Sequence, residues 1–551
     1  MRDDSHDSAV RLVDDFTRGL IGRRQFLARA GGLGLSLGAA SALLAACSDD
    51  DEGDQPESSG PAQGARPGGT LVFARDQEPE SGLNPIGAAD NGSIYAIMQI
   101  FDQLVEVSTK PTPVAGLAES WERSQDGLEW TFSLRDAEFS NGMPVTAEDV
   151  KFTVERFGNP KVNAFYAALG ASVRDAKVMD RKTVRVRLDR VDGAFLDNMS
   201  MFVSSVVPKR VVERVGEEKF AEAPIGSGPF MVANFVRGQR LELERNPNHW
   251  RPDRPYLDGV VLEFVPNSNT RVLRVRSGEA DVAAEIPYNQ VESLDGSGDL
   301  SVESAEVFKW DAIWFNTKEK PLDDRRVRQA LNYATPKEGI LESVLFGEAD
   351  VANSIIARVK YWDEGVPVYP YDLDRARQLL RQSSAPDGFT LPLVIASGDP
   401  VERQTAEIVK EEWSKIGVDV QIAQQDIGTL ITNWLEGKQT AATFPGNVLS
   451  SDTLSDDNLA FVFYDPEGGA NSFGTGYDNP EVIRLINEAS TSLSEDERGR
   501  KFSEAQRIAM EDAPAVPLFF TKTRTAVRDS VKGFQTFKTG WWPLWDVYME
   551  E

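Results

Sequence analysis

Few side chains in this 551-residue chain could do nucleophilic or metal chemistry. There is one cysteine, Cys47, and there are two histidines, His6 and His249. One cysteine allows no disulfide within the chain and no cysteine-based metal cluster. His6 lies in a segment that we expect to be removed, so the mature chain keeps a single imidazole. A multi-histidine metal site is therefore excluded, and we expect no metal and no cofactor.

Motifs for catalysis are also missing from the sequence. A Ser-His-Asp apparatus would have to use His249, for which we expect a surface or packing role. The Gly-rich run from Gly31 to Gly38 contains the Gly-x-Ser-x-Gly spacing, but it belongs to the predicted signal; the rest of the chain has no such elbow, and the chain has no phosphate-binding loop of the Walker type. Pairs of carboxylates are abundant in so acidic a chain, so acids alone leave a glycosidase open. We nevertheless expect a protein that is not an enzyme.

The amino-terminal segment has the layout of an export signal. Arg23 and Arg24 are followed by Phe26 and Leu27, and an uncharged stretch of small and apolar residues covers 30–46. A positive region before a short apolar region is typical of a secretory signal. The arginine pair resembles a twin-arginine signal, although the family usually has Ser or Thr where Gly22 stands.

The single cysteine falls at the end of this signal. Leu44-Ala45-Ala46-Cys47 resembles the lipobox of bacterial lipoproteins, in which the cysteine sulfur receives a diacylglycerol. Acyl chains anchor a protein through about 0.8 kcal/mol per buried CH₂. Residues 48–69 are polar, acidic and rich in Gly and Pro, so we expect a solvated, disordered tether there. Residues 1–47 are the predicted signal peptide.

Composition limits the partners of the body. Hydrophobic residues make up 41% of the chain, and the formal net charge is −28. The first value indicates a globular protein, and the second argues against nucleic acid or anionic lipid as the main partner.

Strand and helix patterns alternate irregularly from residue 70 onward. Period-2 alternation predicts strands at 128–135 and 183–188, and the segments 70–75 and 418–422 are also predicted to be strands. Capping residues before apolar stripes at i, i+3, i+4, i+7 spacing predict helices. These helix starts are Thr146, Asp324, Asp372, Asn479 and Ser494. The stripes indicate an α/β body and carry no chemistry of their own.

Several motifs resemble one known family. Residues 113–157 (PVAGLAESWERSQDGLEWTFSLRDAEFSNGMPVTAEDVKFTVERF) are similar to the signature of family 5 extracellular solute-binding proteins. These are the dipeptide, oligopeptide and nickel receptors of ABC importers. Further matches follow at 225–230, 244–250, 276–281 and 315–334, and the likeness extends through most of residues 70–545.

This resemblance implies a fold and a domain division. The fold would be that of a type II periplasmic-binding-protein-like α/β protein, with two hinged lobes and an extra subdomain in the first lobe (cluster C architecture). The first lobe core would comprise 70–92, 216–315 and 521–551. The extra subdomain would comprise 93–215, and the second lobe 316–520. Hinge closure would enclose a solute between the lobes.

The resemblance also suggests binding residues, while the solute class stays open. Peptide receptors of the family hold the α-ammonium with an aspartate in a Trp-x-Ala-Asp-Tyr-x-Asp-Pro-like segment. The corresponding stretch here, 445–458, lacks the aromatic residues, and Asp452 is the nearest candidate anchor. Aromatic and turn-forming residues are further ligand-binding candidates. They are Trp310, Trp314, Tyr288, Phe444, Asn84, Asn91 and Asn447.

Two solute classes and two roles therefore remain. A di- or oligopeptide is the first expectation and an oligosaccharide the alternative, because aromatic faces also stack on sugar rings. Direct nickel binding by soft ligands is excluded by the lack of histidines and cysteines. The expected partners are ABC permease subunits, reached from a lipid anchor at the outer face of the cytoplasmic membrane. One-to-one delivery implies a monomer, and a peptide-sensing lipoprotein is the alternative role.

Overall fold

The predicted opening strand is β1 (Thr70–Arg75), which lies parallel to both of its neighbours, β10 and β11. The computed structural model describes residues 65–550, apart from 89, 109–111, 163–165, 359 and 446–473. Within these described ranges, no helix is long and apolar enough to cross a membrane. The residues of the predicted signal and lipidation site, Arg23, Arg24, Phe26, Leu27 and Cys47, lie outside them.

The end of the predicted tether already contacts the body. The Gly68 N–H donates a hydrogen bond of 2.9 Å to the Tyr256 carbonyl, and the Asp258 N–H donates one of 2.8 Å to the Gly69 carbonyl. The last two residues of the predicted tether, Gly68 and Gly69, are therefore attached to the body. These hydrogen bonds are made by the backbone, so the polar side chains of this stretch gave no sign of them.

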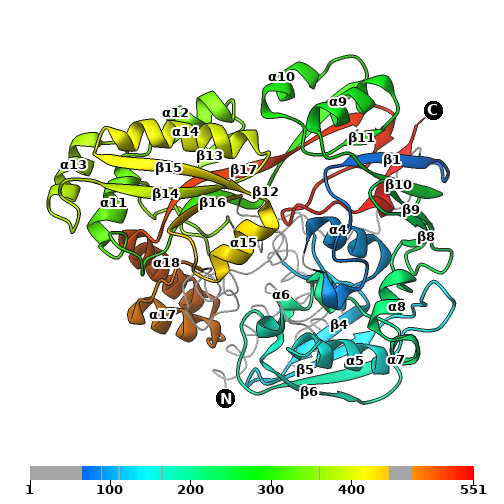
Figure 1. Ribbon diagram of the computed structural model, residues 1–551. Helices are drawn as coiled ribbons and strands as arrows, with labels where there is room; N and C mark the ends of the chain where they lie inside the picture. The colour runs from blue at the N-terminus through cyan, green and yellow to red at the C-terminus, as the bar shows by residue number, and fades with distance from the viewer. Residues whose placement is uncertain are drawn as a thin grey trace, which may run out of the picture.

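One large sheet runs through both lobes (Figure 1). In the described part of the chain it has 11 strands in the order β15-β14-β16-β12-β17-β11-β1-β10-β9-β8, with β13 paired to β17 beside this path. The first lobe contributes β1, β8 (Phe230–Val236), β9 (Arg240–Arg245), β10 (Gly259–Phe264) and β11 (Val282–Ala283). The second lobe contributes β13 (Ala349–Val351), β14 (Phe389–Ala396), β15 (Val418–Gln425) and β16 (Ala441–Pro445).

Two long antiparallel strands, β12 (Leu300–Phe315) and β17 (Ala515–Arg528), join the lobes. Residues 300–306 pair with 522–528 in the first lobe, and residues 310–314 pair with 515–520 in the second. The register shifts between Glu306 and Trp310, so the crossing lies at 307–309. The structure therefore corrects the predicted boundary at 315/316, because the last part of β12 also pairs with β16 of the second lobe. The boundary at 520/521 falls at the same interruption.

Helices cover the sheet in both lobes. In the first lobe they are α4 (Asn91–Ile100), α9 (Ser268–Ser277) and α10 (Val291–Leu294). In the second lobe they are α11 (Arg325–Tyr333), α12 (Lys337–Val344), α13 (Leu373–Arg381), α14 (Pro400–Ser414) and α15 (Ile427–Leu435). Two further helices, α17 (Pro480–Ser490) and α18 (Glu495–Asp512), pack on each other beside α11. The predicted caps Asp324, Asp372, Asn479 and Ser494 each accept a backbone N–H at the start of a helix.

The extra subdomain is built on a second, four-stranded sheet in the order β4-β5-β7-β6. Its strands are β4 (Ala118–Arg123), β5 (Glu129–Leu134), β6 (Val173–Val178) and β7 (Thr183–Leu188). Helix α5 (Ala147–Phe157) begins at Thr146, whose backbone N–H donates 3.0 Å to the Asp149 carboxylate, as the capping-box pattern predicted. The remaining helices here are α6 (Phe195–Asn198), α7 (Lys209–Val215) and α8 (Glu217–Glu222).

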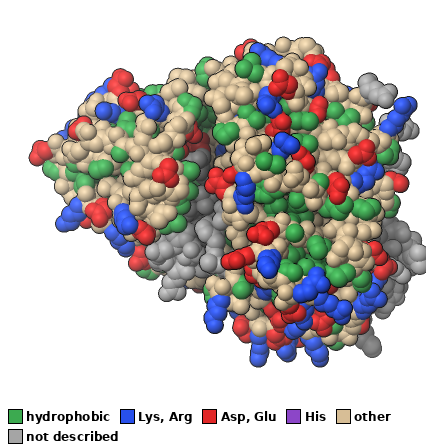
Figure 2. Space-filling view, turned by 45° about the vertical axis from the view of Figure 1, so that its right-hand side comes forward, with side chains coloured by type: hydrophobic (Ala, Val, Ile, Leu, Met, Phe, Trp, Pro, Cys, Tyr) green, Lys and Arg blue, Asp and Glu red, His purple; other side chains and the backbone are tan. Residues whose placement is uncertain are grey.

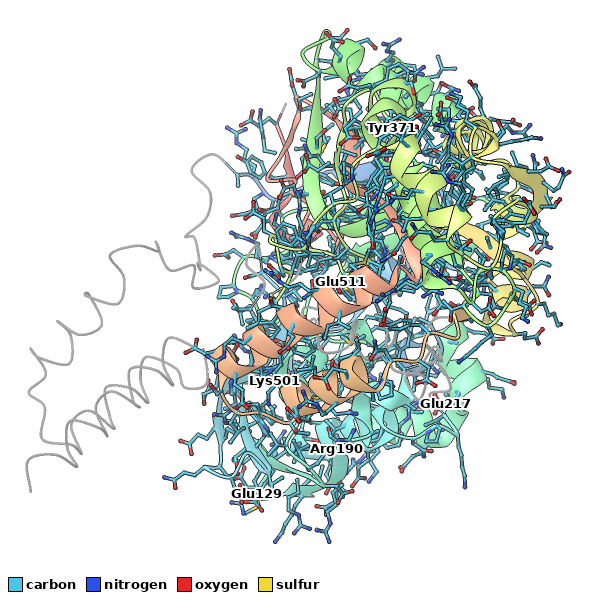
Figure 3. The ribbon with its side chains drawn as sticks, turned by 90° about the vertical axis from the view of Figure 1, so that its left-hand side faces the viewer. Glu129, Arg190, Glu217, Tyr371, Lys501 and Glu511 are labelled. Atoms are coloured by element: carbon cyan, nitrogen blue, oxygen red, sulfur yellow. The ribbon has the colours of Figure 1, made fainter. Side chains whose placement is uncertain are left out.

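The connection between α17 and α18 reaches from the second lobe to this subdomain. The Gly193 N–H donates 2.9 Å to the Ser490 carbonyl. Leu493 lies against Gly127, and the Arg498 guanidinium lies against Gly193. Figure 3 shows α18 between its labelled residues Glu511 and Lys501, with Arg190 of the subdomain below the Lys501 end. The two lobes therefore meet at a second place besides β12 and β17.

Both faces of β12 are buried where it enters the second lobe. Ile313 and Phe315 belong to a core cluster with residues of α11, α12 and α14. Trp310 and Trp314 point to the opposite face and belong to the other large core cluster. This alternation follows from the two-residue period of a strand. Each indole is at most 1% exposed.

Candidate functional site

A cavity of about 560 Å³ lies between the lobes, within the range of small-molecule sites, roughly 300–1,000 Å³. Figure 2 shows the surface hollowed between the smaller and the larger part of the molecule. The first lobe lines the cavity with the ends of β1 and β11, the first residues of α4 and α9, and the segment around Trp542. The second lobe lines it with residues 396–402 and Ile427.

Parallel strands of both lobes point their carboxyl ends at this cavity. β1 runs parallel to β10 and β11, and the residues that follow it, Asp76 and Gln77, line the wall. β14 runs parallel to β15 and β16, and Ser397 and Gly398 follow it. Ligands of α/β proteins bind outside the carboxyl ends of parallel strands, where loops and helix starts meet. The topology therefore makes this cavity the candidate binding site.

In the first-lobe wall, the carboxylate of Glu285 is surrounded by the cationic side chains of the cavity. Glu285 has φ of +47°, an unusual backbone conformation for a side-chain-bearing residue. The Arg524 Nη2 donates 2.8 Å to its carboxylate, and the Arg271 Nη2 donates 2.7 Å to its carbonyl oxygen. Burial alone would raise the pKa of Glu285, but Lys309, Arg524 and other nearby cations lower it below its usual value of 4.5. The carboxylate is thus held charged.

In two of the cavity arginines, Arg271 and Arg524, every guanidinium nitrogen donates a hydrogen bond to this scaffold. Arg271 donates to the carbonyl oxygens of Val265, Pro266 and Ala284 as well as Glu285, at 2.7–2.9 Å. The Arg524 Nε donates 2.9 Å to the Ile286 carbonyl, and its guanidinium lies 3.6 Å from the centroid of the Tyr288 ring. These contacts hold the 284–288 segment against β17 and fix the unusual conformation at Glu285.

Arg75, the last residue of β1, is engaged differently. Its side chain is 4% exposed, and its guanidinium lies 4.9 Å from the centroid of the Tyr95 ring and 5.0 Å from that of Trp542. Asp76 is the paired acid, at 3.8 Å from Nη2, which is beyond hydrogen-bonding distance. Among the residues that the structure describes, Nε has no hydrogen-bond partner.

The second-lobe wall is acidic. Asp399 caps α14, and its carboxylate accepts the Val401 N–H at 2.7 Å and the Glu402 N–H at 3.1 Å. Glu402 is 8% exposed, and its Oε2 accepts the Ala396 N–H and the Thr443 hydroxyl at 2.7 Å each. Its Oε1 has no partner in the described ranges. Burial raises the pKa of Glu402 to about 7.

The Glu402→Gln substitution should remove a pH dependence of stability. The carboxyl titrates near 4.5 when unfolded and at about 7 when folded. Between these pH values the Glu402 carboxyl holds its proton in the folded state and has lost it in the unfolded state. The contribution of this carboxyl to stability is therefore most favourable below pH 4.5 and declines as the pH rises to about 7. The shift corresponds to about 3 kcal/mol at most. We expect urea denaturation to show the variant gaining stability relative to wild type, by up to that amount, between pH 4.5 and 8.

A constant difference between the two proteins over this range would contradict the assignment. Glu407→Gln, an exposed change on the same helix, is the control and should leave the pH profile unchanged. The amide keeps an oxygen for the Ala396 N–H, so the comparison isolates the charge.

The sequence-predicted binding residues separate into four groups. Asn91 and Tyr288 line the cavity. Asn84 is 6% exposed and holds a turn instead, because its side chain accepts from the Ile86 N–H and donates 2.8 Å to Glu217. Trp310 and Trp314 are corrected to core residues, since both faces of β12 are covered. Asp452 and Asn447 lie outside the described residues, as does the side chain of Phe444.

Sequence reasoning missed the charged residues of the walls. Arg75, Lys309 and Glu402 line the cavity, yet they lie far apart in the chain. One signal was available for Arg75 and Glu402. The first ends a buried strand and the second begins a helix, which are the positions that point at ligands in α/β proteins. Nothing comparable distinguished Lys309, which lies inside β12.

His249 has the packing role that was expected of it. Its Nδ1 lies 3.1 Å from the Ser227 carbonyl, and its ring lies 5.6 Å from that of Trp250. Burial lowers its pKa to about 3, so the imidazole is neutral at ordinary pH. It does not line the cavity between the lobes.

Comparison with known proteins decides the family. The sequence model of the bacterial extracellular solute-binding proteins, family 5 (middle), matches residues 112–471. The chain belongs to this family. Family 5 proteins bind peptides or related solutes for ABC importers, so this solute-binding protein is not an enzyme, and the expected type II fold with two lobes is confirmed.

Relatives with known names support the same placement of this family 5 protein. It is 27% identical over 529 residues to the heme-binding protein A of Haemophilus influenzae, covering 91% of this chain and 96% of that one. It is also 27% identical over 502 residues to the dipeptide-binding protein of Escherichia coli (strain K12), covering 84% and 92%. The periplasmic binding protein DppA of Helicobacter pylori, solved in complex with the peptide STSA, superposes with a TM-score of 0.79 at 27% identity, covering 89% and 99%.

Proposed function

We propose that the protein is an exported, lipid-anchored receptor that encloses a peptide-like solute between its lobes and delivers it to an ABC permease. The cavity carries this proposal. Its walls come from both lobes, so a solute there touches both and favours the closed arrangement over the open one. Delivery to a permease rests on membership of a family that serves ABC importers.

The polarity of the cavity favours a peptide over a sugar. Charged side chains of both signs line it, with Arg75 and Lys309 on one side and Asp399 and Glu402 on the other. A peptide has a terminal ammonium, a terminal carboxylate and backbone amides that can pair with such groups. Neutral oligosaccharides offer hydroxyls, which gain less from charged walls. The similarity to the dipeptide-binding protein of Escherichia coli and to the peptide-bound DppA of Helicobacter pylori supports this choice.

Anchoring rests on Cys47 and its setting. The lipobox-like Leu44–Cys47 ends an uncharged stretch, and a polar segment follows it. Two or more acyl chains hold a protein stably at a membrane. The acidic segment after Cys47 would then place the solute cavity in the aqueous phase outside the cell.

Mass spectrometry of the protein purified in detergent from its own cells tests this function. We expect an intact mass that matches cleavage before Cys47 plus acyl chains, and peptides of a few residues in a one-to-one complex. Denatured protein should release these peptides. Oligosaccharides as the released molecules would overturn the peptide assignment, and an unmodified chain recovered from the cytosol would overturn the anchored receptor.

A further inference from the structure

The first-lobe wall holds a buried cation for which the fold supplies little. Arg75 is 4% exposed and lines the cavity. In the described part of the chain, its Nε has no hydrogen-bond acceptor, and Asp76 lies 3.8 Å from Nη2. Buried guanidinium groups are normally satisfied by acceptors, because a buried donor left without one is costly. Arg75 is an exception to this rule, and it lines the cavity, so a ligand group is the natural acceptor for its guanidinium.

The neighbouring arginines show that the fold can satisfy such groups where it needs to. Arg271 has four carbonyl acceptors, and Arg524 has two carbonyls and the Glu285 carboxylate. All three arginines line the same cavity. Among the described residues, Arg75 differs from the other two in having no hydrogen-bond acceptor for its Nε, although the residue lines the cavity.

The position of Arg75 is nevertheless well defined. Tyr95 from α4 and Trp542 from the carboxyl-terminal segment lie 4.9 and 5.0 Å from the guanidinium carbon. The two rings themselves are 5.6 Å apart, centroid to centroid. Aromatic neighbours attract a cation and limit its rotamers without using its N–H donors. The guanidinium is thus positioned in advance, which lowers the entropic cost of binding a partner.

The charge of the first-lobe wall favours an anionic group on the ligand. Around the first-lobe wall four cations, Arg75, Arg271, Lys309 and Arg524, face three carboxylates, those of Asp76, Glu285 and Asp311, so cations outnumber acids there. Glu285 is already bonded to Arg524. The planar guanidinium fork matches the two oxygens of a carboxylate.

We propose that Arg75 is the carboxylate-binding residue for the solute, and that this receptor selects peptide-like molecules with a free carboxylate. This inference rests on the proposed peptide function. The carboxylate can be the terminal one of the peptide or that of an acidic side chain, and both would present the same two oxygens to the guanidinium.

Three pools of synthetic tripeptides separate these possibilities in titration calorimetry. The first pool has free carboxyl termini and no acidic residue, and the second has the same sequences as terminal amides. The third has amidated termini and one Asp or Glu. We expect wild type to bind the amide pool about 10- to 100-fold more weakly than the first or the third. Whichever of these two binds more tightly identifies the source of the carboxylate.

The Arg75→Met variant completes the test. The variant should bind the better carboxylate pool about 10- to 100-fold more weakly than wild type does, and the amide pool with almost unchanged affinity. The effects of the mutation and of peptide amidation on affinity are therefore not additive. Arg237→Met is the matched control. That guanidinium is in the same lobe, lies 4.5 Å from the centroid of the Phe235 ring, and is absent from the cavity wall. It should leave all three affinities unchanged, and melting curves should show that both variants are folded.

Two results would overturn the inference while leaving the function intact. One is equal wild-type affinity for the amide pool and the better carboxylate pool. The other is an Arg75→Met variant that keeps the wild-type preference for carboxylates. Failure of wild type to bind any of the three pools would instead overturn the peptide function, and the role of Arg75 with it.

Discussion

Replacement of Glu285 by glutamine is expected to lower the free energy of unfolding by about 3 kcal/mol. The carboxylate pairs with Arg524 at 2.8 Å, and Lys309 and Arg271 act on it as well. In the variant, Arg524, Lys309 and Arg271 would lose the negative charge that compensates theirs. The amide keeps one acceptor for Arg524, so the loss is that of the charge and not of the whole contact. Urea denaturation at pH 7 measures it.

The pH dependence identifies the cause. Because the folded pKa of Glu285 is lowered, its contribution is complete above its usual pKa of 4.5 and is lost as the pH falls through the folded value. The difference between wild type and variant should therefore shrink in acid. Glu306→Gln, on a carboxylate that is 52% exposed, is the control and should cost no more than about 1 kcal/mol. A Glu285 variant as stable as wild type would refute the electrostatic role.

The Gly226→Ala variant should lose about 3 kcal/mol or more of stability, because its methyl group has no room. A Cβ at this position would lie 2.0 Å from the Ile100 carbonyl oxygen and 2.8 Å from its carbon. The Gly228 N–H donates 2.9 Å to that same oxygen, and the Gly226 carbonyl accepts the Ser140 N–H at 2.8 Å. The backbone is thus fixed on both sides. Thermal and urea denaturation should both show the loss.

The control is a glycine with free space. Gly87 is exposed, has nothing within 4 Å of an added Cβ, and has no positive φ. Gly87→Ala should change stability by no more than about 0.5 kcal/mol. If the two alanine variants were equally stable, the tight approach of residues 226–228 to the end of α4 would be wrong.

Individual helices and strands of this fold could be predicted because the residues that define them are neighbours in the sequence. Ser494 accepts the Glu497 N–H at the start of α18, and Asn479 precedes a proline in the first turn of α17. Side chains that cap helices act within three residues, so spacing alone reveals them. The alternation of Trp130, Phe132 and Leu134 likewise gave β5, whose alternate residues are buried.

The cavity was less predictable because it depends on contacts between distant parts of the chain. Arg75 meets Trp542 across most of the sequence, and no local pattern links them. Trp310 and Trp314 illustrate the opposite error. Their size and spacing suit a ligand surface as well as a core, and only the cover on both faces of β12 decides between the two. A two-residue period shows which residues share a face but not what covers it.

The contact between Gly193 and Ser490 has a consequence for how the receptor rests without its solute. A backbone hydrogen bond contributes about 1 kcal/mol, which corresponds to roughly a fivefold change in an equilibrium constant. The packing of Leu493 on Gly127 and of Arg498 on Gly193 adds to it. If the lobes separate about β12 and β17, this clasp has to be released. This contact therefore favours the closed form of the empty molecule by that factor, and a solute needs correspondingly less of its binding free energy to close the lobes.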